Sequence, residues 1–106
     1  MAREYAARLV VMIKPEVLRA ARGPLSDAAA DAAARYREAY RSARAGARPP
    51  RYVVLNVDSG VSLGQRIYLP SAVKLAEGSA ARGGACTVLD CKRGLRRWPD
   101  DPGAAA

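Results

Sequence analysis

The sequence predicts an α/β (α+β) domain in which one long helix with an Ala/Tyr face packs on a small three- or four-stranded sheet. Three observations support this class: a continuous apolar run early in the chain, an alanine-rich segment with helical spacing, and a later segment of alternating apolar residues. The predicted order is strand, helix, helix, strand, strand, helix, strand. A chain of 106 residues suits one domain of this kind.

The first strand is expected in the apolar run 9–13. The run is short, rich in branched residues and followed by Lys14-Pro15, which favours a central strand buried on both faces. A helix that contains this run is the alternative. Residues 15–22 begin with a proline, which a first helical turn tolerates, and they end before Gly23-Pro24. They predict a short helix.

The long helix is expected over residues 26–45. Ser26 is its predicted N-cap, and acidic residues near its start and basic residues near its end suit the helix dipole. Its sheet-facing residues are small apart from two tyrosines, so the helix can lie close to a sheet. These residues are Ala29, Ala33, Tyr36, Tyr40 and Ala43. Gly46 and the prolines at 49–50 end the helix.

A hairpin is predicted over residues 51–69, with a turn at 58–60 and a bulge at Gly64. The apolar residues expected on one face of its second strand are Val61, Leu63, Ile67 and Leu69. A short helix over 72–77, closed by Gly78, and a flexible loop over 78–85 follow. The last strand is expected over 86–91. We expect the folded domain to span 1–91, and residues 92–106 to form a basic and then flexible tail.

The net charge is the strongest global feature. The chain carries 18 basic and 10 acidic residues, a net charge of +8 and a pI near 10.2. Most of the basic residues are arginines, whose guanidinium groups bind phosphate or carboxylate with two hydrogen bonds. Nucleic acid, an anionic membrane surface or an acidic protein surface is therefore the expected kind of partner. A GC-rich genome is the alternative explanation for the excess of arginine over lysine.

An arginine stripe is the first candidate site. Its members are spaced by four, three and four residues, which would place them on one helical face, and one more arginine follows. They are Arg37, Arg41, Arg44, Arg48 and Arg51. Like charges at this spacing destabilise a helix, so the stripe indicates an anionic partner such as a phosphate backbone. A solvated helix face is the alternative.

A basic arm near the C-terminus is the second candidate site. Four cations stand beside the only tryptophan, in an arrangement typical of an arm whose charges hold a nucleic-acid backbone while the ring stacks on a base. The residues are Lys92, Arg93, Arg96, Arg97 and Trp98. The alternative is that Trp98 folds back into the core.

The residue types present argue against catalysis. The chain has no histidine, and therefore lacks the commonest general base at neutral pH. Cys86 and Cys91 are five apart, which would put them on opposite faces of a strand and too far apart to bridge. They are too few for a four-ligand zinc site. We predict no catalytic residue, no metal and no cofactor.

Two short segments resemble enzyme families. Residues 58–60 follow the apolar residues 53–55 and resemble the Asp-Ser/Thr-Gly triplet of retroviral-type aspartic proteases, but Val61 stands where a small residue is expected. Residues 11–16 with Arg19 resemble the first strand and turn of nucleoside diphosphate kinases, which phosphorylate themselves on a histidine that this chain lacks. We interpret the first as a hairpin turn and the second as coincidence.

The sequence thus predicts a small, non-enzymatic, basic protein that binds RNA or DNA through the stripe and the arm. The alternative is a structural or assembly subunit of a virion or multiprotein complex, which would bind an acidic protein surface and could oligomerise through a sheet edge. No apolar run is long enough to span a membrane. A soluble cytoplasmic protein in a reducing compartment is expected, and a nuclear or organellar location stays open.

Overall fold

The computed structural model describes residues 12–102, which contain three helices and a four-stranded antiparallel sheet. The predicted α+β class is therefore confirmed. In chain order the elements are α2 (Pro15–Arg22), α3 (Asp27–Arg41), β1 (Tyr52–Asn56), β2 (Ser62–Arg66), α4 (Leu69–Ala81), β3 (Cys86–Asp90) and β4 (Leu95–Trp98).

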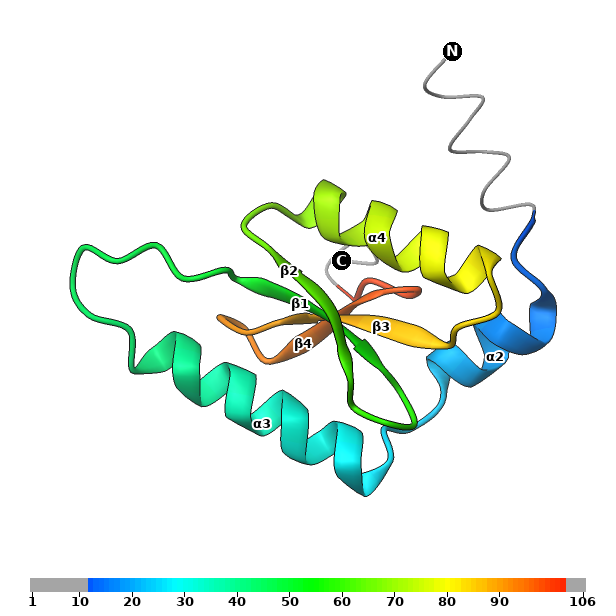
Figure 1. Cartoon of the computed structure of the whole chain (residues 1–106), viewed down its shortest axis with the longest axis horizontal. Helices are drawn as coiled ribbons and strands as arrows, with labels where there is room; N and C mark the ends of the chain where they lie inside the picture. The colour runs from blue at the N-terminus through cyan, green and yellow to red at the C-terminus, as the bar shows by residue number, and fades with distance from the viewer. Residues whose placement is uncertain (1–11, 103–106) are drawn as a thin grey trace, which may run out of the picture.

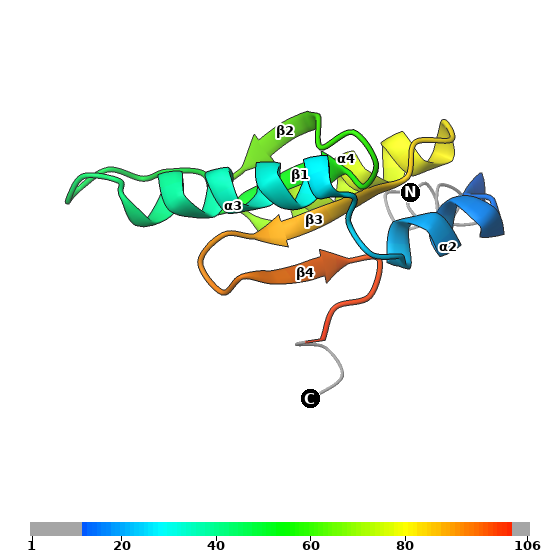
Figure 2. The same ribbon diagram turned by 90° about the horizontal axis from the view of Figure 1, so that it is seen from below.

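The sheet has the order β2-β1-β3-β4, and every neighbouring pair is antiparallel. The two central strands pair from Tyr52 opposite Asp90 to Asn56 opposite Cys86. Helix α3 covers one face of this sheet, and α4 with α2 covers the other (Figures 1 and 2). The described fold therefore has three layers, with β1 and β3 buried between helices.

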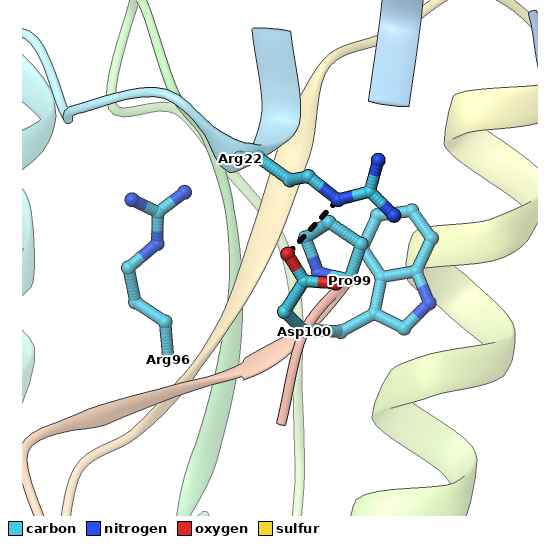
Figure 3. A pocket seen from close by; sticks show the side chains of 5 residues that line it. Arg22, Arg96, Pro99 and Asp100 are labelled. Carbon is cyan, nitrogen blue, oxygen red and sulfur yellow. Dashed lines mark hydrogen bonds and ion pairs between the residues drawn. The ribbon is translucent and has the colours of Figure 1, made fainter. Parts of the chain in front are cut away.

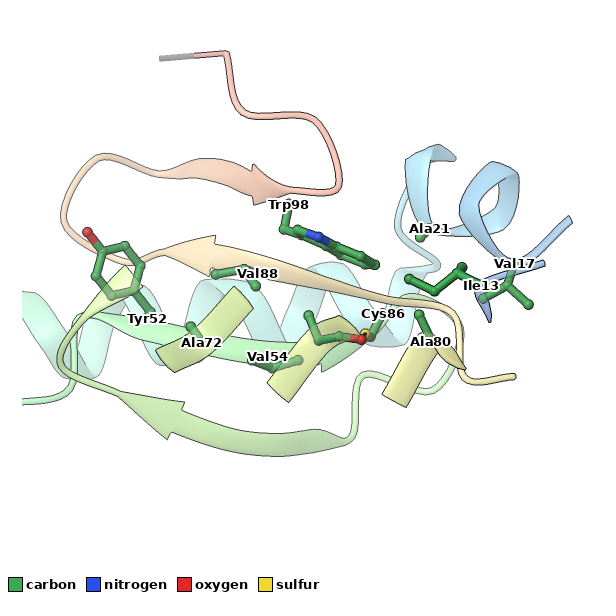
Figure 4. Packing of buried hydrophobic residues seen from close by; sticks show 11 residues of the cluster. Ile13, Val17, Ala21, Tyr52, Val54, Ala72, Ala80, Cys86, Val88 and Trp98 are labelled. Atoms are coloured by element: carbon green, nitrogen blue, oxygen red, sulfur yellow. Dashed lines mark hydrogen bonds between the residues drawn. The ribbon is translucent and has the colours of Figure 1, made fainter. Parts of the chain in front are cut away.

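The larger core lies between the sheet and the helices α2 and α4 (Figure 4). Ala72, Ala76 and Ala80 repeat every four residues along α4 and are almost fully buried, because a stripe of methyl groups lets a helix approach a sheet closely. They pack with the central-strand residues Val54 and Val88.

The smaller core lies on the opposite face of the sheet. Ala32 and Ala33 of α3 pack there with strand residues Val53 and Leu55, and two partly buried tyrosines extend the contact. The hydroxyl of Ser26 accepts a hydrogen bond of 3.1 Å from the N–H of Ala29, as an N-cap does. The predicted N-cap is thus confirmed, and so is the Ala/Tyr face from Ala29 to Tyr40, whereas Ala43 lies beyond the end of the helix.

The first predicted strand is not part of the described sheet. Residues 9–11 lie outside the described residues. Met12, the next residue of the run, is helical, and Ile13 lies in a bend with its side chain buried beside Val17. The strand that is buried on both faces is β3, in which all five residues are buried.

The predicted hairpin turn is confirmed. Asn56 ends β1, and its side-chain oxygen accepts hydrogen bonds of 2.9 Å from the N–H groups of Asp58 and Ser59. Gly60 has a φ of +74°, and a Cβ there would lie 2.7 Å from the carbonyl oxygen of Ala28. Glycine is therefore required both by the backbone conformation and by the close approach of α3.

The predicted bulge is also present, but the expected apolar face of the second strand is not. Val54 pairs with Gly64 while Leu55 pairs with Ser62, so Leu63 is the extra residue. The bulge breaks the alternation. The apolar side chains at 61, 63 and 67 are exposed, and residue 69 belongs to α4.

Several predicted boundaries were wrong. Helix α3 ends at Arg41 and not at residue 45, and α4 begins at Leu69 and not at residue 72. Helix α4 continues through Gly78 to Ala81, where a loop was expected, because burial of Ala80 against the sheet outweighs the low helix propensity of one glycine. The folded part does not end at residue 91 either. Residues 95–98 form β4, which pairs with β3, and Trp98 belongs to the larger core.

Candidate nucleic-acid interface

A buried carboxylate stands at the centre of the predicted basic region. Asp90 ends β3 and is fully buried. Its oxygens accept two hydrogen bonds of 2.9 Å from Arg51 and one of 3.1 Å from Arg97. They also accept hydrogen bonds of 3.1 and 3.2 Å from the backbone N–H groups of Lys92 and Arg93. Asp90 therefore holds the β3–β4 turn in place.

The pKa of Asp90 reflects two opposing effects. Burial would raise the pKa of this carboxyl group, but hydrogen bonds from Arg51 and from the backbone N–H of Arg93 favour the charged form more strongly. The pKa of Asp90 is therefore lowered below its ordinary value. The same hydrogen bond raises the pKa of the Arg51 guanidinium.

Two predicted site arginines, Arg51 and Arg97, are occupied by ion pairs within the fold. Arg51 pairs with Asp90 and lies over the ring of Tyr52, 5.2 Å from its centroid. Arg97 pairs with Asp90 and, at 2.8 Å, with Asp101. These guanidinium groups stabilise the end of the sheet, and their charges are largely balanced by the two carboxylates.

Arg96 links β4 to the end of α2. Its Nε donates to Thr87 Oγ1 at 3.0 Å, and its two terminal nitrogens donate to the carbonyl groups of Gly23 and Ala21. Burial lowers the pKa of Arg96. Its guanidinium group is thus committed to the last turn of a helix, where orphan carbonyls need donors.

The predicted stacking arm does not exist as an arm. Trp98 is only 8% exposed and packs with Ala21 and Val88 in the larger core (Figure 4). Its carbonyl oxygen accepts a hydrogen bond of 2.8 Å from Thr87. The alternative interpretation is therefore correct, because Trp98 folds back into the core.

The arginine stripe is also divided. Helix α3 ends at Arg41, so Arg44 and Arg48 lie in the connection to β1 and do not continue a helical face. The three buried residues of α3 all lie in the first half of the helix. The last turns extend past the sheet (Figure 1), where no packing would offset the low helix propensity of Ser42 and Gly46.

Arg37 is the residue that joins α3 to the β3–β4 turn. Its guanidinium group lies against Gly94, where a Cβ would come within 2.6 Å of Arg37 Cζ. The Nε atom of Arg37 is buried without a hydrogen-bond partner among the described residues. Gly94, with a φ of +69°, leaves the space that this side chain fills.

Five cations remain exposed at this end of the molecule, and we call them the basic end. They lie at the end of α3, in the connection to β1 and in the β3–β4 turn, which are found at the same end of the molecule in both views (Figures 1 and 2). The residues are Arg41, Arg44, Arg48, Lys92 and Arg93. Glu38 is the acidic residue on the same part of α3, and it accepts a hydrogen bond from Ser42.

A small hollow lies at the other end of the molecule, beside α2 (Figure 3). It is lined by Arg22, Arg96, Trp98, Pro99 and Asp100. Arg22 and Asp100 form an ion pair of 2.9 Å across it. Because Arg96 is held by backbone carbonyls, both guanidinium groups of this hollow already have partners.

The cysteines lie as the sequence predicts. Cys86 belongs to the larger core and Cys91 to the smaller, so they point to opposite faces of the sheet, and both are free thiols. Burial raises the pKa of each thiol to about 11. Residues 12–102 contain no group of three or more His, Cys, Asp or Glu residues that could hold a metal.

Comparison with protein families, curated proteins and solved structures gives no match to this chain. Within residues 12–102, no helix has the length and apolar character needed to cross a membrane.

Proposed function

We propose that the protein binds the phosphate backbone of a nucleic acid through the basic end. The contact between Arg37 and Gly94 is the observation that carries this proposal. It brings α3 beside the β3–β4 turn, so that cations from segments about fifty residues apart in sequence lie at one end of the molecule. Clustering of exposed arginine and lysine is the electrostatic footprint of phosphate binding.

The aromatic side chains support contact with phosphates over stacking on bases. Trp98 and Tyr52 are buried, and Tyr36 and Tyr40 pack partly buried against the smaller core. None of the described aromatic rings is therefore both exposed and part of the basic end. Without a ring to stack on bases, binding would be largely independent of sequence.

The salt dependence of binding tests the proposal. If all five cations contact phosphates of a duplex, log affinity falls linearly with log salt with a slope of about −4.5. Fluorescence anisotropy with RNA and DNA duplexes and single strands of several sequences would give this slope and the preferred form. A flat salt response, or strong preference for one sequence, would contradict the proposal.

A matched pair of triple variants separates the basic end from net charge. Arg41→Gln with Arg44→Gln and Arg48→Gln should make the slope shallower by roughly 2.7. The control is Arg19→Gln with Lys74→Gln and Arg82→Gln, three exposed cations outside the basic end. It removes the same charge and should leave the slope nearly unchanged. Equal effects of the two triples would show that only net charge matters.

An assembly subunit whose basic end meets an acidic protein surface is the second candidate, favoured by the exposed apolar side chains near β2. The ultraviolet absorbance and the oligomeric state of freshly purified protein distinguish these two functions. Copurifying nucleic acid, seen in its ultraviolet absorbance, favours the first function, and a nuclease-resistant oligomer free of nucleic acid favours the second. Two free thiols are consistent with the expected reducing compartment, such as the cytoplasm.

A further inference from the structure

Exposed apolar side chains are concentrated at one edge of the sheet. Five large apolar residues are exposed in the described part of the chain, and four of them lie in β2 or beside it. Their exposed fractions are 59% for Val61, 40% for Leu63, 49% for Ile67 and 66% for Tyr68. Single exposed apolar residues are ordinary, but several of them along one strand indicate an interaction surface.

The strand beside this group is open to pairing. Strand β2 is an edge of the sheet, and no described segment lies beyond it in Figure 2. An edge strand offers unpaired backbone groups to another strand. Two backbone groups of β2 already have side-chain partners within the strand. The Gly64 N–H donates to the Ser62 hydroxyl, and the Gln65 carbonyl accepts a hydrogen bond from Arg66.

The opposite edge is protected in a way that β2 is not. Strand β4 carries two arginines and a register shift, and Pro99 follows it directly. Charges, bulges and prolines are the features that discourage pairing at an edge. In β2 the only charged residue is Arg66, no proline interrupts residues 62–66, and the bulge is its one protective feature.

We propose that β2 pairs antiparallel with β2 of a second copy of this chain, about a two-fold axis near Gly64. The charge of the strand favours this arrangement, because antiparallel pairing about Gly64 sets each Arg66 opposite Ser62 of the other copy. Parallel pairing in register would bring the two Arg66 side chains together. The pairing joins two four-stranded sheets into one of eight strands.

The available area predicts a weak dimer. The four exposed side chains present on the order of 400 Å² per copy, within the range of the largest patch on a typical monomer. Even complete burial of two such patches and of the strand backbone would cover only roughly 1,000 Å², just below the standard size for stable interfaces. The dimer should therefore dissociate on dilution, in a micromolar or weaker range.

Sedimentation equilibrium after nuclease treatment in high salt tests the proposal, from about 1 µM to about 1 mM protein. The average mass should rise toward that of a dimer. Leu63→Lys places a charge on the exposed edge and should weaken self-association at least tenfold. Ile67→Lys should have the same effect and is the second variant to use if Leu63→Lys does not fold. Met12→Lys is the matched control, since Met12 is 64% exposed but lies away from β2.

A monomer at every concentration would overturn the proposal. So would a dimer that Leu63→Lys and Ile67→Lys leave intact, or one that Met12→Lys disrupts equally. These results are independent of the proposed nucleic-acid binding, because the cations of the basic end are unchanged in all three variants and nucleic acid has been removed.

Discussion

Arg51 donates two hydrogen bonds of 2.9 Å to the carboxylate of Asp90, from a position 39 residues earlier in the chain. The contact joins the start of β1 to the end of β3. It also orients Asp90 so that the carboxylate accepts hydrogen bonds from the N–H groups of the following turn. One fully buried carboxylate thus fixes both a strand pair and the turn that carries Lys92 and Arg93.

Asp90→Asn should lower the free energy of unfolding by about 3 kcal/mol, the lower end of the range for breaking a buried ion pair, because Arg51 is partly exposed. Urea unfolding measures this value. Asp100→Asn is the control. It removes an ion pair whose carboxylate side chain is 68% exposed, and it should change stability by less than about 0.5 kcal/mol. Equal losses in the two variants would contradict the central role of Asp90.

The contribution of Asp90 should disappear in acid. The pKa of this carboxyl group is lowered in the folded protein, so the unfolded chain binds the proton more readily. Stability from Asp90 is therefore complete above the unfolded value of about 3.9 and is lost as the pH falls through the folded pKa. The difference in unfolding free energy between the wild type and Asp90→Asn should shrink below about pH 4. A difference that stays constant down to pH 2 would refute this.

Gly94→Ala should destabilise the protein more than Gly83→Ala. Both glycines have positive φ, so an alanine is strained at either by about 1 to 2 kcal/mol. Only at residue 94 does the new Cβ meet another group, the Arg37 guanidinium, while nothing lies within 4 Å at residue 83. In a double-mutant cycle by thermal unfolding, Arg37→Ala should relieve the excess cost of Gly94→Ala and leave that of Gly83→Ala unchanged.

Gly78→Ala should stabilise the protein. Residue 78 lies inside α4, and a Cβ there would meet only the end of the Arg82 side chain at an ordinary 3.6 Å. Alanine restricts the unfolded chain and favours helix, so the gain should be about 0.4 to 1 kcal/mol. Gly60→Ala is the contrasting variant and should be strongly destabilising, because its Cβ would meet the backbone of Ala28. A loss of stability in Gly78→Ala would contradict the packing of α4.

Local chemistry made part of the fold predictable. Pro15 at the start of α2, the Ser26 cap and the turn at 58–60 act within a few residues of themselves, so the sequence alone indicates them. The positions of Cys86 and Cys91 on opposite faces followed from strand periodicity in the same way. What could not be predicted was where burial would override propensity, as in the continuation of α4 past Gly78.

The candidate site was less predictable because charge and local spacing say nothing about contacts between segments that are distant in the sequence. Arg96 donates to carbonyl groups 73 and 75 residues away, and no spacing in the sequence marks that contact. The same holds for Arg51 and Arg97 with Asp90. One signal was available: Asp90 follows the apolar residues Val88 and Leu89 and stands next to the basic segment, and an aspartate is rarely buried without a cationic partner.

The two cores share no side chain, since alternate residues of β1 and β3 serve opposite faces. On the face of α3 the helix contributes mainly alanines, whereas the other face also has Trp98, Ile13 and Val17. Detachment of α3 would uncover Val53, Leu55 and Leu89 of the smaller core, but it would leave the larger core on the opposite face packed. Its backbone amides should therefore exchange with solvent deuterium before those of α4, through partial opening and not global unfolding.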